Sequence, residues 1–138
     1  MIELPPKGQE VSLEEIELIC AEYHLYNLWR KIKANPPKRP FKSDGCSWWP
    51  DEWKDISGRV VSIYKHCFLH DLKYWAAYPE KDNPEEQIER FIADAELIIG
   101  VVKDTYRIEL GEMMWPGVRA GGHERWNMSF SWGFGRKE

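Results

Sequence analysis

The sequence has no apolar run long enough to cross a membrane, because its longest, LIIGVV at residues 97–102, covers less than two helical turns. Positive charge is also scarce: 19 Lys and Arg stand against 23 Asp and Glu, for a net charge of -4. Without a broad basic field, nucleic acid is not expected as a partner. The start, MIELPPKGQE, lacks the apolar stretch of a secretion signal. We therefore expect a soluble chain, cytoplasmic at synthesis, with no transmembrane segment.

Cysteine is rare, and three residues cannot all pair within one chain. Cys20 is the expected odd one, because Cys46 and Cys67 flank the motif described below. Whether these two pair is left open, since a cytoplasmic location would keep all three reduced. No internal repeat or low-complexity tract is present, so we expect one domain over residues 1–138. Its oligomeric state is left open.

Three helices are predicted from caps and apolar periodicity. Ser12 and Glu15 form a capping box for a helix over 12–33, which ends before Pro36. A second helix is expected over 59–78, and a third begins after the cap Asn83. The apolar face of the third helix is predicted to comprise Ile88, Phe91, Ile92, Ala95, Ile98, Ile99, Val102 and Tyr106.

Residues 35–58 and 107–138 differ in character from these helices. The first stretch holds four prolines and two glycines and predicts a long, ordered loop. In the second, RWNMSFSWGF alternates large and small side chains, which predicts a strand over 126–134 with a possible partner near 113–119. The fold class expected is mostly α, with an N-terminal helix, a core over 35–106 and a small C-terminal β element.

The stretch CFLHDLKYW, residues 67–75, carries the chemistry. Helical spacing places Cys67, His70 and Tyr74 on one face. The second and third helices are joined by a short turn, so they are expected to be antiparallel and to bring His70 and Asp94 to the same depth. A carboxylate that holds an imidazole makes a positioned general base. Asp71 points away from that face and is available to bind a cation such as calcium.

These residues resemble a known family. SDGCS at residues 43–47, followed by C-x-x-H-D-x-x-Y, is similar to the small bacterial and fungal secreted phospholipase A2 enzymes. The run HDLKYWAAYPEKDNPEE with ADAEL also resembles the phospholipase domain of parvovirus capsid proteins. The resemblance covers roughly residues 43–97.

The resemblance implies a role for each matching position. His70 would be the general base that activates water, and Asp94 would hold its other ring nitrogen. Calcium would be bound by Asp71, by Asp44 and by the Gly45 carbonyl. A Cys46–Cys67 disulfide would tie this loop to the helix, and Tyr74 would support the site. The implied activity is calcium-dependent hydrolysis of the sn-2 ester at a phospholipid interface or micelle, by a chain released on lysis or carried on a virus-like particle.

Other interpretations remain open from the sequence. An inward histidine is often a satisfied core residue, and lone cysteines are often buried thiols. The chain could keep this fold as a catalytically silent binding or assembly module, related to a phage or virus. A zinc site from Cys46, His66, Cys67 and His70 is a further alternative, although neighbouring residues on a helix point apart. Trp48, Trp49 and Trp53 could cover the core or meet a lipid surface.

Overall fold

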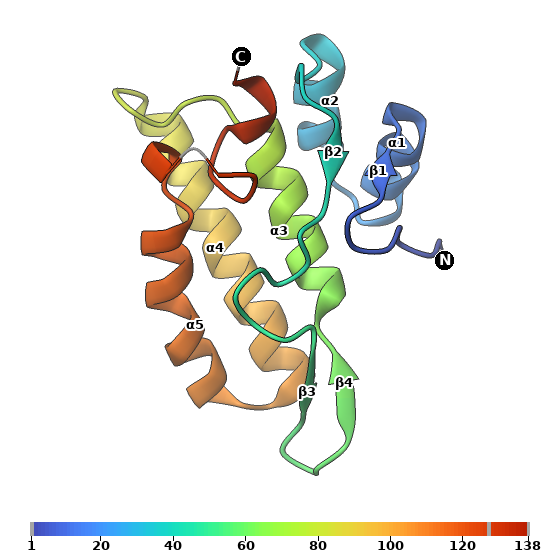
Figure 1. Cartoon of the computed structure of the whole chain (residues 1–138), viewed down its shortest axis with the longest axis vertical. Helices are drawn as coiled ribbons and strands as arrows, with labels where there is room; N and C mark the ends of the chain where they lie inside the picture. The colour runs from blue at the N-terminus through green and yellow to red at the C-terminus, as the bar shows by residue number, and fades with distance from the viewer. Residues whose placement is uncertain (1, 127, 138) are drawn as a thin grey trace.

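The computed structural model describes residues 2–126 and 128–137 of the chain (Figure 1). It is mostly helical, as predicted, and adds two small antiparallel sheets, β1 with β2 and β3 with β4. The elements are β1 (Glu10–Val11), α1 (Leu13–Glu22), α2 (Tyr26–Ala34), β2 (Phe41–Lys42), β3 (Glu52–Lys54), β4 (Val60–Ser62), α3 (Tyr64–Ala76), α4 (Pro84–Thr105), α5 (Ile108–Gly121), and the 3-10 turns η1 (Glu124–Trp126) and η2 (Phe134–Arg136). Within the described ranges, no helix combines the length and apolar character needed to traverse a bilayer.

Three helices form the layer that carries the site. The long helix α4 lies between α3 and α5 and runs antiparallel to both (Figure 1). The α3–α4 connection is short, and Asn83 caps α4 by accepting from the Glu86 N–H, with Pro84 in the first turn as predicted. The segment between β2 and β3 crosses in front of α3 and α4 (Figure 1). The layer and this crossing segment enclose the space described in the next subsection.

Two apolar clusters hold the molecule together. One joins the N-terminal helices to α3, and its buried members are Val11, Ile16, Ile19, Cys20, Ile32, Phe41, Phe68, Leu72, Trp75 and Ala76. The other lies where α3, α4 and α5 meet, and its buried members are Cys46, Ile63, Cys67, Leu97, Val101, Leu110 and Met114. The second cluster forms the floor beneath the site residues.

The predicted N-terminal helix over 12–33 is in fact two helices. Its capping box is present, with the Glu15 N–H donating to the Ser12 hydroxyl. The chain then leaves α1 through His24, whose φ of 58° is left-handed. The His24 N–H bonds to the Ala21 carbonyl and the Leu25 N–H to the Cys20 carbonyl, which is the hydrogen-bond pattern of a Schellman termination. The second predicted helix is also shorter than expected, because β4 takes residues 60–62.

The predicted C-terminal β element is wrong. Residues near 113–119 belong to helix α5, and 126 together with 128–134 forms 3-10 turns and bends; Asn127 lies outside the described residues. The Ser131 N–H donates to the Met128 carbonyl, and Gly133 has a φ of +80°, so the backbone turns instead of extending.

Gly121 in α5 has no room for a side chain, because a Cβ at this position would lie 2.8 Å from the ring of Trp48.

The predicted apolar face of α4 is also placed wrongly. The helix buries another stripe, and five of the residues predicted as core are exposed: Ile88, Phe91, Ile92, Ile99 and Tyr106. Asp94, expected at the margin of the buried face, lies at its centre and is 0% exposed. Hydrophobic periodicity therefore identified the helix correctly but not the direction in which it faces.

The C-terminal segment makes a first testable prediction. Trp132 is 1% exposed and packs edge-on against Tyr74, whereas Trp126 is 50% exposed. We expect Trp132→Ala to lower the free energy of unfolding by about 3–5 kcal/mol, and Trp126→Ala by about 1 kcal/mol, measured by urea unfolding followed by circular dichroism.

Trp132→Phe provides the control. The Trp132 indole N–H is buried without a hydrogen-bond partner among the described residues, so the ring can be replaced at much smaller cost than its removal. Equal losses for the Trp132→Ala and Trp126→Ala variants would contradict this packing and restore the alternating strand.

Candidate functional site

The two residues expected to meet across the helix pair do so. The Nε2 atom of His70 on α3 lies 2.7 Å from Oδ1 of Asp94 on α4. Both side chains are largely withdrawn from solvent, with 11% of His70 and none of Asp94 exposed. A carboxylate oxygen accepts hydrogen bonds, so Nε2 is the donor in this contact and Nδ1 is the ring nitrogen that faces away from Asp94. That nitrogen makes no hydrogen bond to the described residues and is available to take a proton.

Asp94 holds three partners at once. Its Oδ1 also accepts from the Tyr74 hydroxyl at 2.5 Å, and its Oδ2 accepts from Arg119 Nη1 on α5 at 2.6 Å. A buried carboxylate is stable only when it is paired and hydrogen-bonded, and this set provides both. Burial and the nearby Asp94 charge raise the pKa of Tyr74 well above its usual range, so its hydroxyl keeps the proton that it donates.

A second arginine, Arg90, holds Tyr74 and the end of α5 in this arrangement. Arg90 is buried, and its Nε donates to the Tyr74 hydroxyl at 3.1 Å. Its guanidinium also bonds to Glu80 and to the carbonyls of Val118 and Arg119 in the last turn of α5. A cation at a helix C-terminus satisfies carbonyls that the helix leaves unpaired. Arg90 thereby places the turn that presents Arg119 to Asp94.

Asp71, next to the histidine, faces the crossing segment between β2 and β3. Its Oδ2 accepts from the Ser43 hydroxyl at 2.8 Å and from the Asp44 N–H at 3.0 Å. Its Oδ1 makes no hydrogen bond within the described part of the chain. Burial raises the pKa of Asp71 to about 8, opposed by the Ser43 hydrogen bond and reinforced by the charges of Asp44 and Asp51. The buried carboxylate therefore resists ionisation in the absence of a cation.

The loop around Gly45 is a tight turn with carboxylate side chains around it. Gly45 has a φ of +64°, and its N–H bonds to the Ser43 hydroxyl. The Cys46 N–H donates to Asp51 Oδ1. Asp44, a predicted cation ligand, turns its carboxylate toward Ser129, whose hydroxyl donates to it at 2.8 Å. The loop thus keeps the charges of Asp44 and Asp51 near Asp71, while the Gly45 carbonyl has no partner within the described residues.

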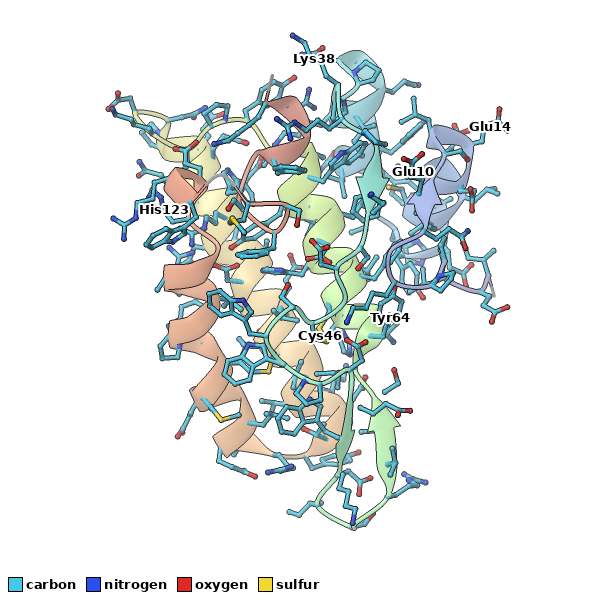
Figure 2. All side chains as sticks on the ribbon, viewed as in Figure 1. Glu10, Glu14, Lys38, Cys46, Tyr64 and His123 are labelled. Atoms are coloured by element: carbon cyan, nitrogen blue, oxygen red, sulfur yellow. A yellow bond between two sulfur atoms is a disulfide. The ribbon has the colours of Figure 1, made fainter. Side chains whose placement is uncertain are left out.

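A disulfide joins Cys46 to Cys67 and ties this loop to α3, as the resemblance implied. Cys46 lies where the crossing segment passes over the helical layer (Figure 2). The bond consumes both thiols, and His66 is occupied by Asp104, with Nε2 at 2.6 Å from Oδ2. These two contacts remove the alternative zinc site, because its thiolate ligands do not exist. Cys20 is the unpaired cysteine and is buried.

A small pocket with a cavity volume of about 50 Å³ lies between the loop and the helices. His70, Asp71 and Gly45 line it together, while the remaining wall is mainly apolar and is contributed by Cys46, Ser47, Trp48, Trp49, Cys67, Leu97, Met114, Gly117, Val118, Gly121, Gly122 and Phe130. Trp48 is exposed at its edge and packs edge-on against Phe130. An apolar pocket with a few convergent polar groups is the usual form of a small-ligand site.

The donor set at this pocket suits a hard cation in part. Asp71 Oδ1 and the Gly45 carbonyl are oxygen atoms without partners among residues 2–126 and 128–137. Calcium accepts carboxylates, backbone carbonyls and water together. Over the same residues, no group of three or more His, Cys, Asp or Glu side chains is placed to hold a metal. A cation here would therefore depend on backbone oxygens and water for most of its ligands.

The sequence did not reveal several residues that build this site. Arg119 and Arg90 complete the Asp94 network, and Ser43, Asp51 and Ser129 order the loop carboxylates. Ser43 directly precedes the Asp-Gly pair, so an oxygen-rich turn was a usable signal there. No sequence pattern marks Arg119. Compared with known proteins, the chain matches no family, no curated protein and no solved structure.

The raised pKa of Asp71 predicts how stability depends on pH. The folded protein holds the proton up to about pH 8, whereas the unfolded chain releases it near the ordinary value of 3.8. Stability is therefore fully present below pH 3.8 and is lost as pH rises toward 8, because the native state binds the extra proton. Each unit of difference is worth about 1.4 kcal/mol, so the loss amounts to a few kcal/mol in chelator.

Asp71→Asn tests this dependence, since an amide oxygen can still accept from Ser43 and Asp44. We expect the free energy of unfolding of the variant to vary less between pH 4 and pH 8 than that of the native protein. At the alkaline end of this range, the stability of the variant should increase relative to the native protein. Parallel profiles for the two proteins would show that Asp71 ionises normally.

Arg119 makes a second prediction. Its removal leaves Asp94 buried with a charge that lacks its cation, and the partial exposure of Arg119 reduces the cost to roughly 1–3 kcal/mol. We expect Arg119→Met to destabilise by this amount and Arg119→Met combined with Asp94→Asn to lose less than the sum of the single changes. Additive losses in this double-mutant cycle would show that the two residues do not interact energetically.

Proposed function

We propose that this chain hydrolyses the sn-2 ester of phospholipids with a water molecule activated by His70, in the manner of the phospholipase A2-like family. The observation that carries the proposal is the 2.7 Å contact between His70 and Asp94 at the wall of an apolar pocket, with Asp71 on the next residue. A neutral imidazole held through Nε2 offers Nδ1 as a base to a water in the pocket.

Each residue then has a defined part. His70 takes the proton from the attacking water and returns it to the glycerol oxygen as the ester bond breaks, and Asp94 stabilises the imidazolium in between. Tyr74 and Arg119 hold Asp94 in place against the ring through their hydrogen bonds. The apolar pocket walls accept the acyl chain, and Trp48 at the edge provides an exposed aromatic surface for the lipid interface. No serine or cysteine nucleophile is required, because water attacks directly.

Asp71 and the Gly45 carbonyl would hold calcium, with Asp44 near enough to add its negative charge. When bound, the ion polarises the ester carbonyl and offsets the charge that develops on its oxygen. The protein's own contribution is to place the Asp71 carboxyl group beside His70, with Oδ1 free of protein hydrogen bonds among the described residues. Its raised pKa means that binding a cation displaces a proton, so calcium affinity should increase with pH up to about 8.

The test is release of fatty acid from the sn-2 position of mixed micelles, with calcium and with chelator. We expect release that requires calcium and that falls by about 10²–10⁴-fold in His70→Ala, the range for loss of a general base. His66→Ala is the matched control, because His66 is also a histidine on α3 paired to an α4 carboxylate. It should retain activity.

The outcomes separate the proposal from its alternative. No release from folded protein that binds calcium would favour the silent binding or assembly module. Release that survives His70→Ala would remove His70 from the mechanism. Equal loss in both histidine variants would mean that the changes disturb the α3–α4 packing instead of the chemistry.

A further inference from the structure

The outward face of α4 is apolar along its whole length. Ile88 is 60% exposed, Ile92 48%, Ile99 64% and Tyr106, which caps the helix, 68%. Phe91 is exposed beside them and packs edge-on against Trp115 of α5. Scattered exposed apolar residues are normal, but a continuous row of them marks an interaction surface.

The inward face of the same helix is the more polar one. Glu86, Arg90, Asp94 and Thr105 are buried there among Ala93, Leu97 and Val101. The network around Asp94 explains why polar groups face inward. Val102 packs against Gly111 of α5 and Ala95 is half-buried, but the other four members of the outward row are exposed. The helix therefore satisfies its polar side internally and leaves most of its apolar side to a partner.

The spacing of the outward row specifies what that partner is. Ile88, Ile92, Ala95, Ile99, Val102 and Tyr106 follow one another at intervals of four, three, four, three and four residues. This alternation keeps side chains on a narrow seam that faces another helix, as in a coiled coil. The seam spans about 27 Å at 1.5 Å per residue. A membrane surface needs only an apolar face and no such regular spacing.

We propose that α4 pairs antiparallel with α4 of a second copy of this chain, about a two-fold axis near the middle of the seam. In this register Ile88 lies opposite Tyr106 of the partner, Ile92 opposite Val102, and Ala95 opposite Ile99. All six seam residues are used, and the small Ala95 lies near the axis, where it allows close approach. A two-fold interface requires one self-complementary patch, which this seam provides.

The charges flanking the seam agree with this register. Glu89 and Lys103 lie seven residues to either side of Glu96 on the same edge of the helix. The two-fold axis therefore brings Glu89 of one copy to Lys103 of the other, twice per dimer. Glu96 meets its own copy, and Lys73, 3.3 Å from Glu96 in each chain, offsets that repulsion.

The area is adequate for a moderate dimer. A large aromatic side chain offers roughly 150–250 Å² and an aliphatic one somewhat less, so the four exposed members present on the order of 400 Å² per chain. With flanking residues this approaches the roughly 800 Å² that each partner buries in a standard interface. The pocket is unaffected, because Leu97, the α4 residue that lines it, is on the opposite side of the helix.

Sedimentation velocity from low micromolar to several hundred micromolar protein tests the proposal. We expect a species of twice the 16.4 kDa chain mass to grow with concentration. Ile99→Glu should raise the dissociation constant by at least about tenfold, since it buries a charge in the seam. Leu18→Glu on α1, at a position 60% exposed, is the matched control and should leave dimerisation unchanged. Circular dichroism checks that both variants are folded.

Crosslinking tests the orientation. With a short bis-maleimide, Glu96→Cys should crosslink to itself, and a mixture of Glu89→Cys with Lys103→Cys should crosslink between the two variants. Cys20 is buried and the other two cysteines are paired, so the introduced thiol is the reactive one. Lys103→Cys alone should remain uncrosslinked.

Three results would overturn the proposal. They are a monomer at every concentration, a dimer that Ile99→Glu does not weaken, and strong crosslinking of Lys103→Cys to itself. A monomer whose binding to phosphatidylcholine vesicles falls in Ile99→Glu but not in Leu18→Glu would reassign the seam to a lipid surface. The measurements need no catalytic activity, so their outcome is independent of whether the chain hydrolyses phospholipids.

Discussion

The buried carboxylate of Asp94 is the group on which the rest of the arrangement depends. It is removed from water entirely, and it is hydrogen-bonded by an imidazole and a phenol from α3 and by a guanidinium from α5. These groups come from both neighbouring helices, so α3 and α5 are fixed on either side of α4 by the needs of one side chain. Arg90 then anchors the end of α5 through its carbonyls.

This demand has a consequence for the long helix. A helix that must direct Glu86, Arg90 and Asp94 inward cannot bury all of its isoleucines as well. The apolar side is turned outward as a result, and the fold is stabilised instead by the cluster that joins the N-terminal helices to α3 and by the one where α3, α4 and α5 meet. The buried polar network and the exposed seam both result from the way α4 is rotated about its own axis.

These relations explain what the sequence could and could not predict. The meeting of His70 and Asp94 followed from two helices and a short turn, because chain geometry sets their depth. The break at His24 was missed, since a non-glycine residue in the left-handed region gives no sequence signal. Arg119 was missed because a glycine-rich stretch suggested turns, whereas those glycines make room for Trp48 and Tyr74 against a helix. The face of α4 was misjudged because periodicity measures apolar clustering and not burial.

The order of the site residues along the chain determines when the site can be completed. His70 and Asp94 are synthesised together, but Arg119 and Ser129 emerge later, after all of α4. Because a single domain generally folds as a unit, Asp94 gains its cation and the Asp44 loop gains its tie through Ser129 only once the segment after α4 is present. A chain that stopped at the end of α4 would therefore lack two of the contacts that hold the site together.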